Sequence, residues 1–175
     1  GFSEMLRATP PGNNGSIMFP WFEAEITPDV RTPGVRRVDL AAGDKARNVR
    51  AVVEAQMMAL ANHSRWMGVE VDVIHATGGA AVNTDILQVL ADVFEAKVRR
   101  FKVTNSACLG AALRAYHAEA TANGSGLSWE KVVDGIAVPV AESPIMPKQS
   151  SVKTYTRLRR RYAKLEPLAI SGCSD

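Results

Sequence analysis

A chain of 175 residues that is 46% hydrophobic and 22% charged has the composition of a globular protein with one sizeable core. No apolar run approaches the roughly 20 residues that a membrane helix needs, which argues against a membrane protein. The net charge of +3 is mild and comes largely from residues 157–164, where a solvated helix face is a better explanation than a nucleic-acid-binding patch.

The two cysteines are too few for a disulfide framework or a metal site. Cys108 lies in an apolar helical pattern and is predicted to be a buried thiol, whereas Cys173 lies in a polar tail. Both fit a reducing compartment, and the first fifteen residues show no secretion signal. We therefore expect a cytoplasmic protein.

The N-terminal part of the chain predicts a strand, a long connection and a long helix. After a loop rich in proline, glycine and asparagine at 8–16, residues 16–22 form a strand whose proline favours a sheet edge. Two prolines and two glycines make 23–43 a connection. Asp44 can then cap a helix over 45–67, in which apolar side chains recur at helical spacing.

The rest of the chain alternates between strands and helices. The predicted elements are a buried strand at 71–76, a helix capped by Asn83 or Thr84, a second strand at 98–103, a helix from Asn105 or Ser106 to about 120, a short helix at 127–136 and a long helix at 150–168. Helices and strands in alternation with short joins predict a layered α/β domain.

The stretch "IHATGGAAVNTDILQVLADVF", residues 74–94, places two glycines between a strand and a helix. Glycines there permit positive φ and let a ligand lie on the backbone, and the helix start suits a phosphate. The Asn83 side chain both donates and accepts, so it could pair with a purine edge. These features would suit a nucleotide over Gly78, Gly79 and Ala80, but the spacing alone slightly favours the simpler explanation, a tight turn with a helix cap. Neither a P-loop nor a Rossmann fingerprint is present.

Other candidate residues have simpler explanations. Three histidines have no Cys, Asp or Glu at ligand spacing and are predicted to be core or surface residues: His63, His75 and His117. Glu54 is interpreted as a buried structural acid in preference to a site residue. Glu25 and Thr27 could face a cleft, but the following proline makes a turn an equal explanation. The residues nominate no catalytic base and no metal ligand.

The segment "ATGGAAVNTDILQVLADVFEAKV" resembles the adenosine-binding segment of the FGGY carbohydrate kinases, in which a strand is followed by T-G-G-x-x-x-N and L-Q-x-L-A-D. The matching residues are Thr77, Gly78, Gly79, Asn83, Leu87, Gln88, Leu90, Ala91 and Asp92. The stretches "NNGS", "EITPD", "VEAQMMA", "NSACLGAALRAYHA" and "YAKLE" resemble the animal-type branch of this family, which phosphorylates D-xylulose. The resemblance extends from about residue 2 to about residue 168.

This resemblance implies an actin-like, ribonuclease-H-like ATPase fold. Residues 1–175 are then expected to be the later part of the C-terminal nucleotide-binding domain, with the N-terminal domain absent. In the family pattern Gly79 and Ala80 lie against the phosphate–ribose side of ATP, Gly78 supports the turn, and Asn83 contacts the adenine. The reaction also implies Mg²⁺ and D-xylulose, and the catalytic aspartate and most sugar-binding residues would lie in the remaining part of the same kinase. No nucleic acid or membrane is implied.

Two stretches depart from the bacterial pattern of the family. They are Ala80–Ala81–Val82 and the residues Ala24 to Pro28, and the animal-type branch accepts both changes. Another sugar kinase of the family, acting on ribulose or glycerol, and a non-catalytic nucleotide-binding module remain alternatives. A piece of a larger domain is also expected to expose an apolar face where the missing strands belong, and to be inactive alone.

Overall fold

The computed structural model describes residues 1–101, 105–136, 138–141 and 144–172, and its strands form two separate pairs. The strands are β1 (Ile17–Trp21), β2 (Gly34–Val38), β3 (Val73–Ala76) and β4 (Lys97–Arg100). The helices are α1 (Phe2–Arg7), α2 (Lys45–His63), α3 (Thr84–Phe94), α4 (Ser106–Ala122), α5 (Trp129–Val133) and α6 (Gln149–Ser171). Short 3-10 turns lie at Asn13–Gly15, Arg65–Met67 and Gly79–Val82.

The unit β3–α3–β4 sets the character of the fold. β3 and β4 pair in parallel, from Val73 opposite Lys97 to Ala76 opposite Arg100. Parallel neighbours need a crossover connection, and α3 supplies it. On its other edge β4 forms an antiparallel bridge from Val98 to Ile145. The predicted α/β fold is therefore confirmed.

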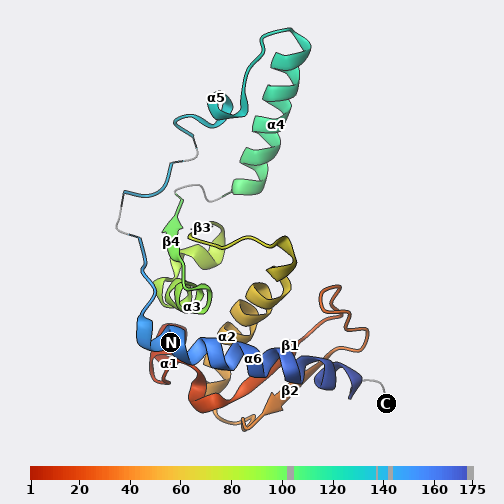
Figure 1. The fold of residues 1–175 in the computed structure, drawn as a ribbon, viewed down its shortest axis with the longest axis vertical. Helices are drawn as coiled ribbons and strands as arrows, with labels where there is room; N and C mark the ends of the chain where they lie inside the picture. The colour runs from red at the N-terminus through yellow and green to blue at the C-terminus, as the bar shows by residue number, and fades with distance from the viewer. Residues whose placement is uncertain (102–104, 137, 142–143, 173–175) are drawn as a thin grey trace.

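A helical layer packs on the antiparallel hairpin of β1 and β2, which lies below α3 in Figure 1. α2, α3, α6 and β1 share one core, centred on Phe19, which is 0% exposed. Its ring lies 5.2 Å from that of Trp21 and 4.7 Å from that of Tyr162. Aromatic pairs at such distances add to the hydrophobic stabilisation from burial. This core holds α3 and thereby the turn that precedes it.

α4 and α5 project from the far end of the molecule (Figure 1). α4 contains no buried residue and packs mainly against α5, where the His117 ring stacks 4.1 Å from that of Trp129. Cys108 is exposed, so the prediction of a buried thiol is wrong. The apolar pattern around Cys108 predicts a packed face, but no described element covers that face.

The predicted helices are confirmed with adjusted bounds, whereas the predictions for the strands hold only in part. Asp44 caps α2, since its carboxylate accepts a hydrogen bond from the Arg47 amide at 3.1 Å. β3 is less buried than predicted, with Ala76 as its one buried residue, because β4 is the only described strand beside it. α1 was not predicted, and β2 lies inside the predicted connection. Residues 102–103 of the predicted second strand, and Cys173, lie outside the described residues.

No helix in the described ranges combines the length and the apolar character needed to cross a membrane.

Candidate functional site

The turn between β3 and α3 begins at Gly78, which has a backbone conformation that only glycine adopts readily. Its φ of 85° and ψ of −173° fall in a region that is essentially closed to residues with a Cβ. The chain then forms the 3-10 turn Gly79–Val82 before α3 starts. The conformation of the turn therefore accounts for Gly78 without any ligand.

Gly79 has no such explanation in the free protein. Its φ lies outside the left-handed range, and a Cβ added to it would meet no atom of the described residues within 4 Å. Neither backbone strain nor crowding would then exclude an alanine. A glycine here leaves room for a ligand to approach the backbone closely, although Gly43 and Gly110 are equally open. The neighbouring Ala80 is small and exposed, and leaves the same space open.

Two backbone amides of the turn have no acceptor in the described part of the chain. They are the amides of Gly79 and Ala80, which come before the first amide that bonds within the turn. The amides of Ala81 and Asn83 donate to the carbonyl oxygens of Gly78 and Ala80, each at 3.1 Å. The first N–H groups of any helical turn lack intrahelical partners. Here they lie next to open space and can donate to ligand oxygens.

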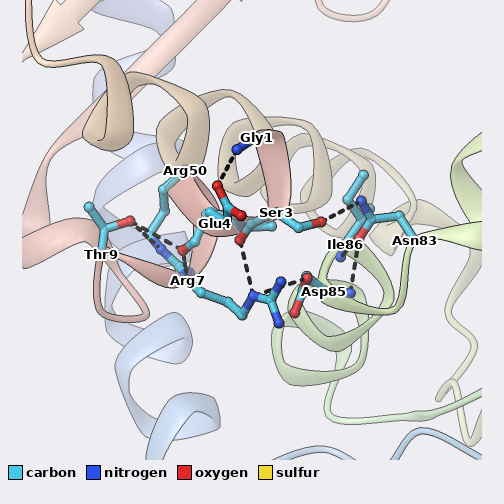
Figure 2. Close-up of polar contacts among 10 residues, drawn as sticks. Gly1, Ser3, Glu4, Arg7, Thr9, Arg50, Asn83, Asp85 and Ile86 are labelled. Atoms are coloured by element: carbon cyan, nitrogen blue, oxygen red, sulfur yellow. Dashed lines mark hydrogen bonds and ion pairs between the residues drawn. The ribbon is translucent and has the colours of Figure 1, made fainter.

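Asn83 caps α3, as predicted, and the cap uses its side-chain oxygen. Oδ1 accepts from the amides of Asp85 and Ile86 at 3.0 and 3.2 Å, and Nδ2 donates to Ser3 Oγ at 3.0 Å (Figure 2). A reversed amide would point N–H groups at two backbone donors, so the network fixes the orientation. One amide N–H is left without a partner among the described residues. Asn83 can therefore offer a base a donor, but no longer the donor–acceptor pair that its residue type suggests.

α1 forms the side of this site that the sequence did not reveal. It brings Ser3 to Asn83, and the Arg7 Nε lies 3.6 Å from Asp85 Oδ2 in the first turn of α3 (Figure 2). Arg50 of α2 holds the end of the helix by donating to the Leu6 carbonyl at 2.5 Å. No local motif marks Ser3, which is 80 residues from Asn83 in the sequence.

Glu54 lies outside the turn and is a buried structural acid, as predicted. Its Oε1 accepts from the Gly12 amide at 2.8 Å, from Tyr155 at 2.7 Å and from Arg50 at 3.1 Å. Burial raises the pKa of Glu54, and burial together with the nearby Glu54 carboxylate raises the pKa of Tyr155. This network joins α2, α6 and the segment after α1, and so fixes the position of α1.

The motif residues Gln88 and Asp92 on α3 also have structural partners. Asp92 is buried and accepts from the Lys148 amide at 2.7 Å and from Gln88 at 2.9 Å. Gln88 also donates to the Met146 carbonyl at 3.0 Å. These two side chains therefore fasten the start of α6 to α3, and do not point to a second site.

The other candidates do not join the glycine turn. Each histidine has a partner of its own: His63 pairs with Glu166, His75 lies against Phe101, and His117 stacks on Trp129. No group of three or more metal-binding side chains exists among the residues described. Glu25 and Thr27 line a separate pocket of about 500 Å³ beside Trp21 and Trp66. Backbone hydrogen bonds between Glu25 and Val30 close the turn there as well.

The fold is similar to that of solved carbohydrate-kinase structures. A ligand-bound xylulose kinase from Lactobacillus acidophilus matches it with a TM-score of 0.77 at 22% identity, over 97% of this chain and 34% of that one. Gluconate kinase from the same organism matches with a TM-score of 0.79 at 20% identity, over 99% of this chain and 35% of that one. The predicted fold, that of actin-like sugar kinases, is thereby confirmed.

The chain belongs to the FGGY family of carbohydrate kinases, since residues 3–119 match the C-terminal domain of that family. The xylulose kinase of Rattus norvegicus is 39% identical over 97% of this chain, and that of Mus musculus is 38% identical over 97%. The matched regions are 32% and 31% of those proteins, so the chain spans about a third of the length of these relatives. The resemblance found in the sequence is confirmed.

Proposed function

We propose that this chain supplies the adenosine-binding part of a kinase that transfers the γ-phosphoryl group of ATP to the 5-hydroxyl of D-xylulose. The observation that carries the proposal is the open turn at Gly78–Gly79, where the second glycine has no structural need in the free protein. The acceptor follows from the rat and mouse relatives, which are xylulose kinases at 38–39% identity.

Each residue of the turn has a role in this proposal. The free amides of Gly79 and Ala80 donate to the phosphate–ribose side of the nucleotide. Gly78 holds the turn open through its left-handed φ of 85°. The remaining N–H of Asn83 donates to a ring nitrogen of adenine, since its oxygen is used by the helix cap.

The reaction is an in-line displacement. A bond forms between the sugar oxygen and the γ-phosphorus, the bond from that phosphorus to the β–γ bridging oxygen breaks, and ADP leaves. The proton of the sugar hydroxyl passes to a base in the remaining part of the same kinase. This chain binds and orients the adenosine end, and closure over the substrate excludes water. We expect the chain alone to be inactive.

Mg²⁺ belongs to this proposal through the chemistry of ATP, whose phosphate charge it neutralises. The described residues do not fit a metal site of their own, because they contain no cluster of three or more His, Cys, Asp or Glu side chains. The ion is therefore assigned to the nucleotide phosphates and to residues of the remaining part of the kinase. An enzyme that consumes ATP fits a cytoplasmic location.

The acceptor is tested by measuring ADP formation by the full-length gene product with ATP and Mg²⁺. D-xylulose, D-ribulose, L-ribulose and glycerol are compared as acceptors. We expect strong preference for D-xylulose. Preference for another acceptor would reassign the chain to a different sugar kinase of the family. A protein that binds ATP and phosphorylates none of them would be a nucleotide-binding module.

The nucleotide site is tested by Asn83→Asp in the same protein. Aspartate caps helices as well as asparagine does, so α3 and the melting temperature should be preserved. The substitution removes the N–H donor and adds a negative charge near ATP. We expect the KM for ATP to rise about three- to tenfold or more. Asn123→Asp, at the exposed far end of α4, is the matched control and should leave KM unchanged.

A further inference from the structure

We propose that Ser3 is a positioning residue of the nucleotide site, which orients the Asn83 amide so that its free N–H faces the base. The inference rests on the proposed function, because it takes Asn83 as the contact to adenine. Ser3 belongs to α1, which has neither a glycine turn nor a residue of the family motif.

The geometry around Asn83 gives the first step. The two cap bonds, at 3.0 and 3.2 Å, anchor its oxygen, but they leave the plane of the amide free to turn about that anchor. The bond from Nδ2 to Ser3 Oγ at 3.0 Å adds a third fixed point and sets the plane (Figure 2). Because the amide nitrogen is planar, committing one proton to Ser3 determines the direction of the other.

The anchoring of α1 gives the second step. A helix of six residues has little stability of its own, so tertiary contacts must fix where Ser3 lies. Arg50 donates to the Leu6 carbonyl at 2.5 Å and to Thr9 Oγ1 at 2.9 Å, and is itself held by buried Glu54 at 3.1 Å. At the other side of α1, Arg7 pairs with Asp85. These contacts fix where α1, and with it Ser3, lies relative to Asn83.

The experiment uses the full-length gene product and four variants: Ser3→Ala, Ser3→Thr, Asn83→Ala and the double variant Ser3→Ala/Asn83→Ala. KM for ATP, kcat and the calorimetric affinity for ADP are measured for each. We expect Ser3→Ala to raise the KM for ATP about two- to tenfold with kcat little changed, the effect of one misplaced hydrogen bond. Ser3→Thr keeps the hydroxyl and should restore the wild-type KM.

The double variant separates positioning from a general structural effect. If Ser3 acts through Asn83, then Ser3→Ala adds nothing once Asn83 is alanine. The control is Ser171→Ala at the exposed end of α6, which loses a hydrogen bond of equal length, 3.0 Å, to its own helix. That variant should leave KM and ADP affinity unchanged.

The outcomes distinguish the inference from the function on which it rests. Additive effects of the two single substitutions would overturn the role of Ser3, since it would then act independently of Asn83. A raised KM in Asn83→Ala with none in Ser3→Ala would also overturn it, and would leave the proposed function intact. Unchanged ATP and ADP binding in Asn83→Ala would overturn both.

Discussion

Glu54 places an acid in the middle of the helical layer, where it is 1% exposed. Three donors converge on Oε1, from Gly12, Arg50 and Tyr155, while Oε2 is buried without a partner among the described residues. Burial outweighs these hydrogen bonds and raises the pKa of the carboxyl. The fold therefore favours the neutral acid more than water does, and this has a consequence for stability.

The stability contributed by Glu54 should depend on pH. A raised pKa in the folded state stabilises the fold fully below the ordinary value of 4.5, and this contribution is lost as the pH rises through the folded pKa. The melting temperature of the full-length gene product, relative to that of Glu54→Gln, should be highest at and below pH 4.5 and fall as the pH rises above it. A relative stability that rises with pH would show that the ion pair with Arg50 dominates instead.

At the scale of secondary structure, the elements with local signals were predictable. Asp44 and Asn83 precede their helices by one residue and accept from amides two or three residues further on, so the sequence itself contains the cap. α1 and β2 have no such signal. α1 is six residues long without a side-chain cap hydrogen bond, and β2 is specified by its register with β1. Such distant partners cannot be read from local spacing.

In the candidate site, too, local features were predictable from the sequence and distant contacts were not. The position of Gly78, Gly79 and Asn83 between a strand and a helix was predicted from spacing and from resemblance to the family. That the helix cap occupies the Asn83 oxygen could not be predicted, because the residue type suits both a cap and a base contact and only the three-dimensional structure shows two amides donating to Oδ1. The contact with Ser3 joins residues 80 positions apart and could not be predicted from local sequence patterns.

α4 should behave as the most accessible of the long helices. It has no buried residue, and Cys108 in its first turn is exposed. In a Cys173→Ser variant of the full-length gene product, Ellman's reagent should modify Cys108 without denaturant, at a rate close to that of a small-molecule thiol. Protection of Cys108 that is relieved only by urea would mean that another part of the kinase covers α4.

At the scale of the whole molecule, large apolar side chains are exposed in several places. Ile26 is 94%, Trp66 84% and Val82 76% exposed, although residues of these types are usually buried. The expectation that a piece of a larger domain exposes apolar surface stays a prediction, because single exposed apolar side chains also occur on complete domains. Ile26 lies in the connection between β1 and β2, Trp66 lines the pocket beside β1, and Val82 lies in the glycine turn.

We expect the 175-residue chain to self-associate when it is expressed alone. Size-exclusion chromatography with light scattering should show species larger than the monomer mass of 18.9 kDa. Co-expression with the remaining part of the kinase should give an equimolar complex. A monodisperse monomer of the chain alone would contradict the view that it is a piece of a larger domain.

The contrast between the two glycines of the turn extends to how the sequence would diverge over evolutionary time. The backbone conformation at position 78, with a φ of 85°, requires glycine even in the free protein. A Cβ at position 79 would meet nothing within 4 Å among the described residues. If the turn binds a nucleotide as we propose, then in a descendant that had lost this binding, selection for folding would keep glycine at the first position and no longer require it at the second. A lineage with Gly78 retained and position 79 variable would therefore carry the mark of a pseudokinase.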